Sequence, residues 1–252
     1  MGHNVMFLPG GFQPAAVRYQ ALLSELGEEV EPVLKDLEVY SGAEPPPGYS
    51  VETEIAGIER AADQAGFERF HLYGYSGGGA CALAYTSARP ERVSSLALEE
   101  PAADFTNAEK KSSFWREMLA LLDMTEEQRM REFFVRNLEP GVQLPPRPVG
   151  PPPPWMANRP AGLMAMMGAF HRFAVKDDAY RNFARPVHFV YGSLTRHEYA
   201  VSMRDRLQAL FPDFTATCYE GRHGFDTANQ AEPARLAQEL RRHWSRAMAL
   251  PA

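Results

Sequence analysis

Short apolar runs alternate with longer amphipathic stretches over the first hundred residues of the chain. The short runs predict strands, because four to eight successive apolar or alternating residues suit a buried or half-buried strand. The longer stretches predict helices, and most of them stop at a glycine or just before a proline. The predicted strands cover residues 4–8, 31–39, 70–75 and 93–98, and the predicted helices cover 15–26, 51–65 and 77–88.

The same alternation returns after Pro186. Strands are predicted there at 187–191 and 214–219, and helices at 199–211 and 233–244. A strand–helix–strand rhythm of this kind predicts parallel strands joined by crossover helices. The expected fold class is therefore α/β, with a mostly parallel sheet of about six strands and helices on both faces.

Between the two blocks, from Ala103 on, the rhythm breaks. Residues 105–138 form a mostly helical, amphipathic pattern, residues 140–160 are rich in proline, and 161–173 indicate a further helix. Taken alone, the proline run is typical of a stiff connector. We therefore expect a core made of residues 1–103 and 181–252, and a helical, proline-rich lid inserted at 104–180.

The middle segment is also rich in methionine and aromatic residues. Such side chains suit an adaptable apolar cavity wall, although about half of them are expected simply to pack the segment against the core. We expect Trp115, Met167 and His171, together with Tyr75 in the core, to contact a substrate.

The sequence Gly74-Tyr75-Ser76-Gly77-Gly78 stands between a predicted strand and a small-residue helix. A G-x-S-x-G motif in this context exposes the serine on a strained turn, which requires neighbours without bulky side chains. The following helix begins with free N–H groups, and one of these can hold a developing oxyanion. The motif therefore predicts that Ser76 is a nucleophile, the alternative being a structural Gly-Ser turn.

Composition excludes several other classes of protein. The formal net charge is −6 and the charges are interspersed, which argues against a nucleic-acid partner. No apolar run is long enough for a membrane span, and the first residues lack the pattern of a signal peptide. The two cysteines, Cys81 and Cys218, are both expected to be small core residues, so we expect a cytoplasmic protein. Neither a metal-ligand cluster nor a phosphate-binding loop is present, so no metal and no cofactor are expected.

A serine hydroxyl needs an adjacent base to act as a nucleophile. Among the seven histidines, His223 is the natural candidate because it follows the last predicted strand in a turn of small residues. His71 and His188 lie inside predicted strands and are expected to be hydrogen-bonded core residues. His197 and His171 stay open as alternatives, the latter as a residue of the lid.

The chain resembles the α/β-hydrolase superfamily from end to end. The resemblance is carried by these segments in this order: Pro9-Gly10-Gly11, Asp36-Leu37, Gly74-Tyr75-Ser76-Gly77-Gly78, Arg89-Pro90-Glu91-Arg92-Val93 and His223-Gly224-Phe225. The order of serine before histidine is also that of the family. The resemblance implies a lid-bearing serine hydrolase in which the N–H groups of Gly11 (or Phe12) and Gly77 form the oxyanion hole.

The third member of the catalytic triad departs from the commonest pattern of the family. After the strand that ends in Tyr191-Gly192, the usual spacing to the acid reaches Thr195, which cannot ionise. Some relatives instead carry the acid after the strand that follows the nucleophile helix, and alignment from the nucleophile then gives Glu100. Strand alternation turns only one of Glu99 and Glu100 toward the site. We favour Glu100, with Glu99 and Glu198 as the alternatives.

The expected function is hydrolysis of a carboxylic ester of a small or medium apolar substrate through an acyl-enzyme on Ser76. A thioesterase of a biosynthetic pathway is the first alternative, because such enzymes resemble the same glycine-rich segments. A non-catalytic binding protein on the same fold is the second alternative. The expected partner is a small-molecule substrate, with no nucleic acid and no membrane, and the chain is expected to be a monomer or a homodimer.

Overall fold

The structure is a computed structural model that describes residues 2–143 and 150–249. Its six strands form one sheet in the order β2-β1-β3-β4-β5-β6, and every neighbouring pair is parallel. The α/β fold expected from the sequence rhythm is therefore confirmed. The strands are β1 (His3–Leu8), β2 (Val30–Leu34), β3 (Phe70–Tyr75), β4 (Val93–Glu99), β5 (Val187–Gly192) and β6 (Phe214–Tyr219).

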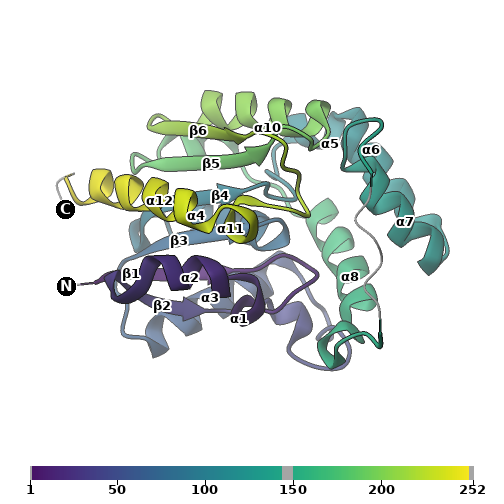
Figure 1. The fold of residues 1–252 in the computed structure, drawn as a ribbon, viewed down its shortest axis with the longest axis horizontal. Helices are drawn as coiled ribbons and strands as arrows, with labels where there is room; N and C mark the ends of the chain where they lie inside the picture. The colour runs from purple at the N-terminus through teal and green to yellow at the C-terminus, as the bar shows by residue number, and fades with distance from the viewer. Residues whose placement is uncertain (1, 144–149, 250–252) are drawn as a thin grey trace.

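Helices cover both faces of this sheet (Figure 1). On one face, α2 (Gln20–Leu26) and α12 (Pro233–Met248) bury Leu22, Leu240 and Trp244 against the strands. On the other face, α3 (Val51–Gln64), α4 (Gly77–Ala88) and α10 (His197–Leu210) bury Ile58 and Leu207, among others. The sheet is thus enclosed by two apolar layers, as parallel sheets generally are. The short helices α1 (Ala15–Arg18) and α11 (Ala228–Ala231) complete the first face.

The central strand β3 and helix α4 approach each other unusually closely. A Cβ atom on Gly74 would lie 2.6 Å from the carbonyl oxygen of Gly78, and one on Gly79 would lie 2.9 Å from Cα of Pro101. Real Cβ contacts are longer than this, so only glycine fits at these positions. The glycines around Ser76 therefore have a packing role, because they let the turn after β3 stay tight.

The segment between β4 and β5 is helical and lies beyond the carboxyl ends of the strands (Figure 1). Residues 144–149 of its proline-rich run lie outside the described residues, and the assignment of the segment as a lid stays a prediction. Side-chain hydroxyls of Thr106, Ser112 and Thr125 cap the starts of three of its helices. Its helices are α5 (Asn107–Lys111), α6 (Ser113–Leu119), α7 (Glu126–Arg136), α8 (Arg159–Arg172) and α9 (Asp177–Arg181).

Two local expectations are corrected by the structure. The second strand was expected to reach Val39, but β2 ends at Leu34, and Glu38–Tyr40 forms a 3-10 turn whose Glu38 N–H donates to the carboxylate of Glu54 at 2.9 Å. Cys218 was expected in the core but is exposed, because β6 is an edge strand, whereas Cys81 is buried as expected. The remaining 3-10 turns are Gly27–Glu29, Pro90–Arg92, Ala120–Asp123 and Pro154–Met156.

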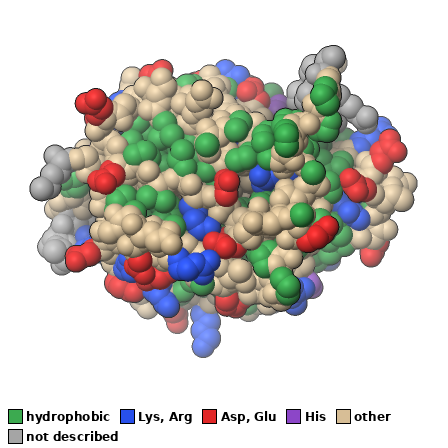
Figure 2. Space-filling view, turned by 90° about the horizontal axis from the view of Figure 1, so that it is seen from below, with side chains coloured by type: hydrophobic (Ala, Val, Ile, Leu, Met, Phe, Trp, Pro, Cys, Tyr) green, Lys and Arg blue, Asp and Glu red, His purple; other side chains and the backbone are tan. Residues whose placement is uncertain are grey.

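Acidic and basic side chains are mixed on the face of the molecule shown in Figure 2, with hydrophobic side chains between them. No extended basic area appears on that face, in line with the net charge of −6. Among the helices of residues 2–143 and 150–249, none combines the length and the apolar character that crossing a bilayer requires.

Candidate active site

Ser76 occupies the turn between β3 and α4 in a conformation that is rare for a residue with a side chain. Its φ is 51° and its ψ is −119°, and such backbone strain costs about 1–3 kcal/mol. Backbone hydrogen bonds hold it there. The N–H of Ser76 donates to the carbonyl of Glu99 at 3.0 Å, and its own carbonyl accepts from Ala80 at 3.0 Å and from Ala102 at 2.9 Å. Backbone hydrogen bonds to Glu99, Ala80 and Ala102 thus hold the strained turn.

A cavity of about 90 Å³ opens beside Ser76. Residues from both the core and the segment after β4 form its walls, and most of these residues are apolar or aromatic. The core contributes Gly11, Phe12, Tyr75, Ser76, Gly77, Glu100, Ala102, Tyr199, Gly224 and Phe225; the segment contributes Phe114, Trp115, Met118, Phe133, Asn137, Leu163, Met166, Met167 and Phe170. The structure therefore places Ser76, the three residues expected at the oxyanion hole and Glu100 around one cavity.

Met166 of α8 lies against both glycines expected at the oxyanion hole. A Cβ atom on Gly77 would lie 3.2 Å from Sδ of Met166, and one on Gly11 would lie 3.1 Å from its Cε. A side chain on either glycine would therefore require the Met166 side chain to move by a few tenths of an ångström. Methionine is flexible, so the same contact can open when a ligand enters.

Glu99 and Glu100 are neighbours in sequence but lie in different surroundings. Glu99 is buried, and it accepts hydrogen bonds from the hydroxyl of Tyr73 and from both the backbone and side-chain amides of Asn229. Glu100 has φ 44° and lines the cavity. Oε1 of Glu100 accepts from the N–H of Gly192 at 2.8 Å and from the hydroxyl of Thr195 at 2.7 Å. Of the two, only Glu100 lies at the cavity.

The carboxyl of Glu100 is buried, and burial raises its pKa to about 7, against the opposing effect of the hydrogen bonds from Thr195 and Gly192. Its second oxygen, Oε2, lies 2.5 Å from where a Cβ atom of Gly224 would be. Gly224 directly follows His223, so this oxygen faces the loop that carries the histidine. Any larger residue at position 224 would collide with the carboxylate.

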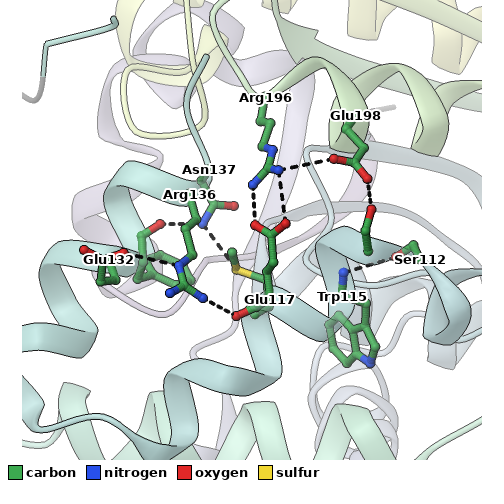
Figure 3. Close-up of polar contacts among 11 residues, drawn as sticks. Ser112, Trp115, Glu117, Glu132, Arg136, Asn137, Arg196 and Glu198 are labelled. Carbon is green, nitrogen blue, oxygen red and sulfur yellow. Dashed lines mark hydrogen bonds and ion pairs between the residues drawn. The ribbon is translucent and has the colours of Figure 1, made fainter. Parts of the chain in front are cut away.

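Glu198 takes part in a different network on the surface (Figure 3). It pairs with Arg196 at 3.2 Å and accepts from the hydroxyl of Ser113. Arg196 also holds Glu117 of α6 through bonds of 2.7 and 3.3 Å, and this pairing lowers the pKa of Glu117. The network attaches α6, which carries Trp115, to the start of α10. Glu198 therefore lies in an interhelical contact and does not line the cavity.

His223 is buried in the turn after β6, and its imidazole faces its own loop. Nδ1 accepts from the N–H groups of Phe225 and Asp226, each at 3.2 Å. Burial lowers the pKa of His223, with Asp226 acting in the opposite direction, so the ring is neutral near pH 7. In the described part of the chain, no hydrogen bond joins this ring to Ser76 or to Glu100, although the loop itself lies against Glu100.

The other residues expected at the site divide between the surface and the cavity wall. His171 is exposed on α8 and does not line the cavity, so its role as a substrate contact stays a prediction; His197 is exposed as well. Tyr75, Trp115 and Met167 do line the cavity. Sequence reasoning missed Arg18, whose buried guanidinium lies 3.8 Å from the centre of the Tyr75 ring. No sequence signal links these two residues, since α1 meets β3 only in the folded chain.

The family model of the alpha/beta hydrolase fold matches residues 39–221. The chain belongs to this family. The resemblance noted from the motifs is thereby confirmed. No protein among the curated sequences matches the chain. The family model, together with the structural similarity to esterases described next, supports a hydrolase enzyme.

Solved structures of several bacterial hydrolases share the fold. An esterase from Exiguobacterium antarcticum is 20% identical with a TM-score of 0.73, over 97% of this chain and 92% of that one. An esterase from Rhodococcus sp. ECU1013 is 19% identical with a TM-score of 0.69, over 97% and 90%. A membrane phospholipase A described as a bacterial virulence factor is 20% identical with a TM-score of 0.71, over 99% and 80%.

Proposed function

We propose that the protein is a serine esterase that hydrolyses a carboxylic ester of a small or medium apolar substrate through an acyl-enzyme. One observation carries the proposal: the strained Ser76 opens onto an apolar cavity that also contains Gly11, Gly77 and the carboxylate of Glu100. Strained non-glycine residues are concentrated at functional sites. Among the described residues only Ser76, Glu100 and Phe105 have a positive φ without being glycine, and the first two are the proposed nucleophile and acid.

In the proposed reaction Ser76 Oγ attacks the ester carbonyl, and the imidazole of His223 accepts the serine proton. The N–H groups of Gly11 or Phe12 and of Gly77 hold the negative charge that develops on the carbonyl oxygen. Protonated His223 then gives its proton to the departing alcohol, and water repeats the sequence on the acyl-enzyme. Glu100 accepts a hydrogen bond from the imidazole and stabilises its charged form.

This reaction requires His223 to turn within its loop. In the described conformation Nδ1 is an acceptor for two backbone N–H groups, whereas in the triad it must carry a proton and donate it to the acid. Oε2 of Glu100 already faces Gly224, the residue next to His223, so the acid lies against the loop in which the imidazole would turn. Catalytic hydrogen bonds often form only when substrate is bound.

The cavity supports the choice of substrate. Its volume of about 90 Å³ is below the roughly 300–1,000 Å³ typical of ligand sites, so a short acyl group suits it in this conformation. Three wall residues of α8, Leu163, Met166 and Met167, are flexible and can yield to a longer chain. Met166→Ala should therefore raise kcat/KM for hexanoyl esters relative to acetyl esters by about tenfold, corresponding to burial of one or two further methylenes.

The decisive test compares wild type with Ser76→Ala on p-nitrophenyl esters and on acyl thioesters of matched chain length. We expect hydrolysis of short-chain esters that disappears in the variant, and a fluorophosphonate adduct on Ser76 detected by intact-mass spectrometry. Faster turnover of the thioesters would instead identify a thioesterase. If folded wild type forms no adduct and hydrolyses neither class, the chain is a binding protein on a hydrolase fold.

A further inference from the structure

Thr195 lies in the short loop between β5 and α10, at the position where the commonest family spacing leads from the strand to the acid. Threonine cannot ionise, but the hydroxyl of Thr195 is hydrogen-bonded on both sides. The residue is 2% exposed, and its single hydroxyl makes two hydrogen bonds. It donates to Oε1 of Glu100 at 2.7 Å and accepts from the N–H of Gly224 at 2.9 Å. One side chain thus joins the end of β4 to the histidine loop after β6.

The first of these bonds fixes the carboxylate of Glu100. With the N–H of Gly192 at 2.8 Å, the hydroxyl of Thr195 holds Oε1, so the rotation of the carboxylate is set by this oxygen. The other oxygen, Oε2, is left facing Gly224. The orientation of the free oxygen toward the histidine loop therefore depends on what binds the first oxygen.

The second bond fixes the loop itself. Both polar groups of Gly224 are held: its N–H donates to Thr195, and its carbonyl accepts from the hydroxyl of Tyr75, the residue before the nucleophile. His223 is adjacent to this residue in the chain. The histidine loop is therefore attached to the acid through Thr195 and to the nucleophile strand through Tyr75.

We propose that Thr195 is a positioning residue, whose hydroxyl sets the carboxylate of Glu100 and the His223–Gly224 turn at a fixed distance from each other. The inference rests on the proposed function, since it assigns Glu100 and His223 their roles in the triad. Simultaneous donation and acceptance at one atom requires a hydroxyl. The branched Cβ of threonine also restricts its χ1, which holds the hydroxyl in place between its two partners.

The experiment replaces Thr195 by valine, which keeps the shape without the hydroxyl, and by serine, which keeps the hydroxyl. We expect Thr195→Val to lower kcat by about tenfold to a hundredfold with KM changed less than threefold, because an orienting group acts on the transition state. Thr195→Ser should stay within about threefold of wild type. Thr86→Val is the matched control, since Thr86 is equally buried and its hydroxyl donates to the carbonyl of Ala82 at 2.8 Å, inside α4.

Carbon-13 NMR of the Glu100 carboxyl, assigned with Glu100→Gln, gives a readout that needs no substrate. Loss of the Thr195 bond removes one of the groups that favour the carboxylate, so the pKa of Glu100 should rise in Thr195→Val and return toward wild type in Thr195→Ser. The charged groups that act on this carboxyl, Glu99 and Arg18, are unchanged in these variants. The acidic limb of the kcat/KM profile should move to higher pH with the same ranking.

Three results would overturn the proposal: a Thr195→Val enzyme within threefold of wild type, an equal loss in the valine and serine variants, or a loss that falls on KM alone. If the valine variant does not fold, Thr195→Ala takes its place in the same comparison. Absence of any Ser76-dependent hydrolysis by wild type would instead refute the proposed function. The NMR titration would still decide whether Thr195 holds Glu100.

Discussion

Histidines lie at both ends of the parallel sheet, and their surroundings differ between the two ends. At the amino ends of the strands, the rings of His3 and His71 lie 5.2 Å apart, and those of His188 and His243 lie 5.8 Å apart. Nδ1 of His71 is hydrogen-bonded to the hydroxyl of Ser95 at 2.8 Å, and the His71 ring lies 5.6 Å from that of Trp244. These histidines are packed against other elements of the core.

At the carboxyl ends, His223 lies in a loop against the carboxylate of Glu100. The loops that leave parallel strands meet at this end, so residues far apart in sequence converge there. The two strained residues Ser76 and Glu100 are also found at this end. His223 is buried like the histidines at the amino ends, but its loop differs in surroundings: Gly224 and Phe225 line the cavity, and Gly224 faces the carboxylate of Glu100.

The largest effect is expected when one histidine at each end of the sheet is replaced. His223→Asn should lower kcat on the best ester by about 10⁴-fold or more, because the serine then has no base. His71→Asn should leave kcat within about threefold and lower the free energy of unfolding by about 1–3 kcal/mol through its lost contacts. Steady-state kinetics and urea unfolding check both. A loss of activity in His71→Asn as large as that in His223→Asn would contradict the assignment.

The second prediction compares the two adjacent carboxylates. Glu100→Gln should lower kcat by about two to four decades with little change in KM, by analogy with losing the acid of a serine triad. Glu99→Gln should lower it less than about tenfold, since Glu99 bonds Tyr73 and Asn229 and lies away from the cavity. Glu198→Gln should behave like Glu99→Gln. Near-normal turnover by folded Glu100→Gln beside a crippled Glu99→Gln would reverse the choice of acid.

Tyr75→Phe should have a smaller effect at the same end of the sheet. The change removes the hydroxyl that donates to the carbonyl of Gly224 and leaves the ring against Arg18. We expect kcat to fall by about threefold to tenfold and the free energy of unfolding to fall by about 0.5–1.5 kcal/mol, the usual contribution of one hydrogen bond. Tyr73→Phe is the control, because that hydroxyl bonds Glu99 instead; an equal fall in kcat there would show that the effect is not specific to the histidine loop.

The last prediction concerns the pH dependence of stability at the amino ends of the strands. Burial lowers the pKa of His3 and His243, and lowers that of His71 to about 3. Below pH 6.5 the unfolded chain therefore binds protons that the folded chain does not, and for His71 this makes stability fall as the pH drops from about 6.5 toward 3. For His71 the fall is up to about 1.4 kcal/mol per pH unit within this range.

Urea unfolding of wild type and His71→Asn at pH 8, 6.5 and 5 measures this effect. The acids with raised pKa values, Glu54, Glu100 and Glu109, act in the opposite direction, but they are common to both proteins and cancel in the difference. The stability advantage of wild type over His71→Asn should therefore shrink as the pH falls. A difference that is constant over this range would show that His71 is not kept neutral in the fold.

The sequence by itself determined the features that depend on local pattern. Apolar runs and amphipathic stretches predicted all six strands and their parallel arrangement, and the glycines around Ser76 predicted the strained turn. Such signals lie within a few residues of one another, because side-chain periodicity and backbone sterics are local properties. The boundaries failed where a distant residue intervened. β2 ends at Leu34, and the 3-10 turn beyond it is bonded to a distant residue, since Glu54 of α3 accepts the N–H of Glu38.

The arrangement of the site was decided only by the tertiary structure. Strand alternation predicted that only one of Glu99 and Glu100 faces the cavity. It did not identify which one, because the left-handed backbone of Glu100 breaks the alternation at the end of β4. Thr195 could be identified from the sequence only as a missing acid. Its hydroxyl acquires a role because folding brings it to Glu100 and Gly224, which lie 95 and 29 residues away along the chain. Contacts of this kind depend on how the loops pack, and no local pattern in the sequence specifies them.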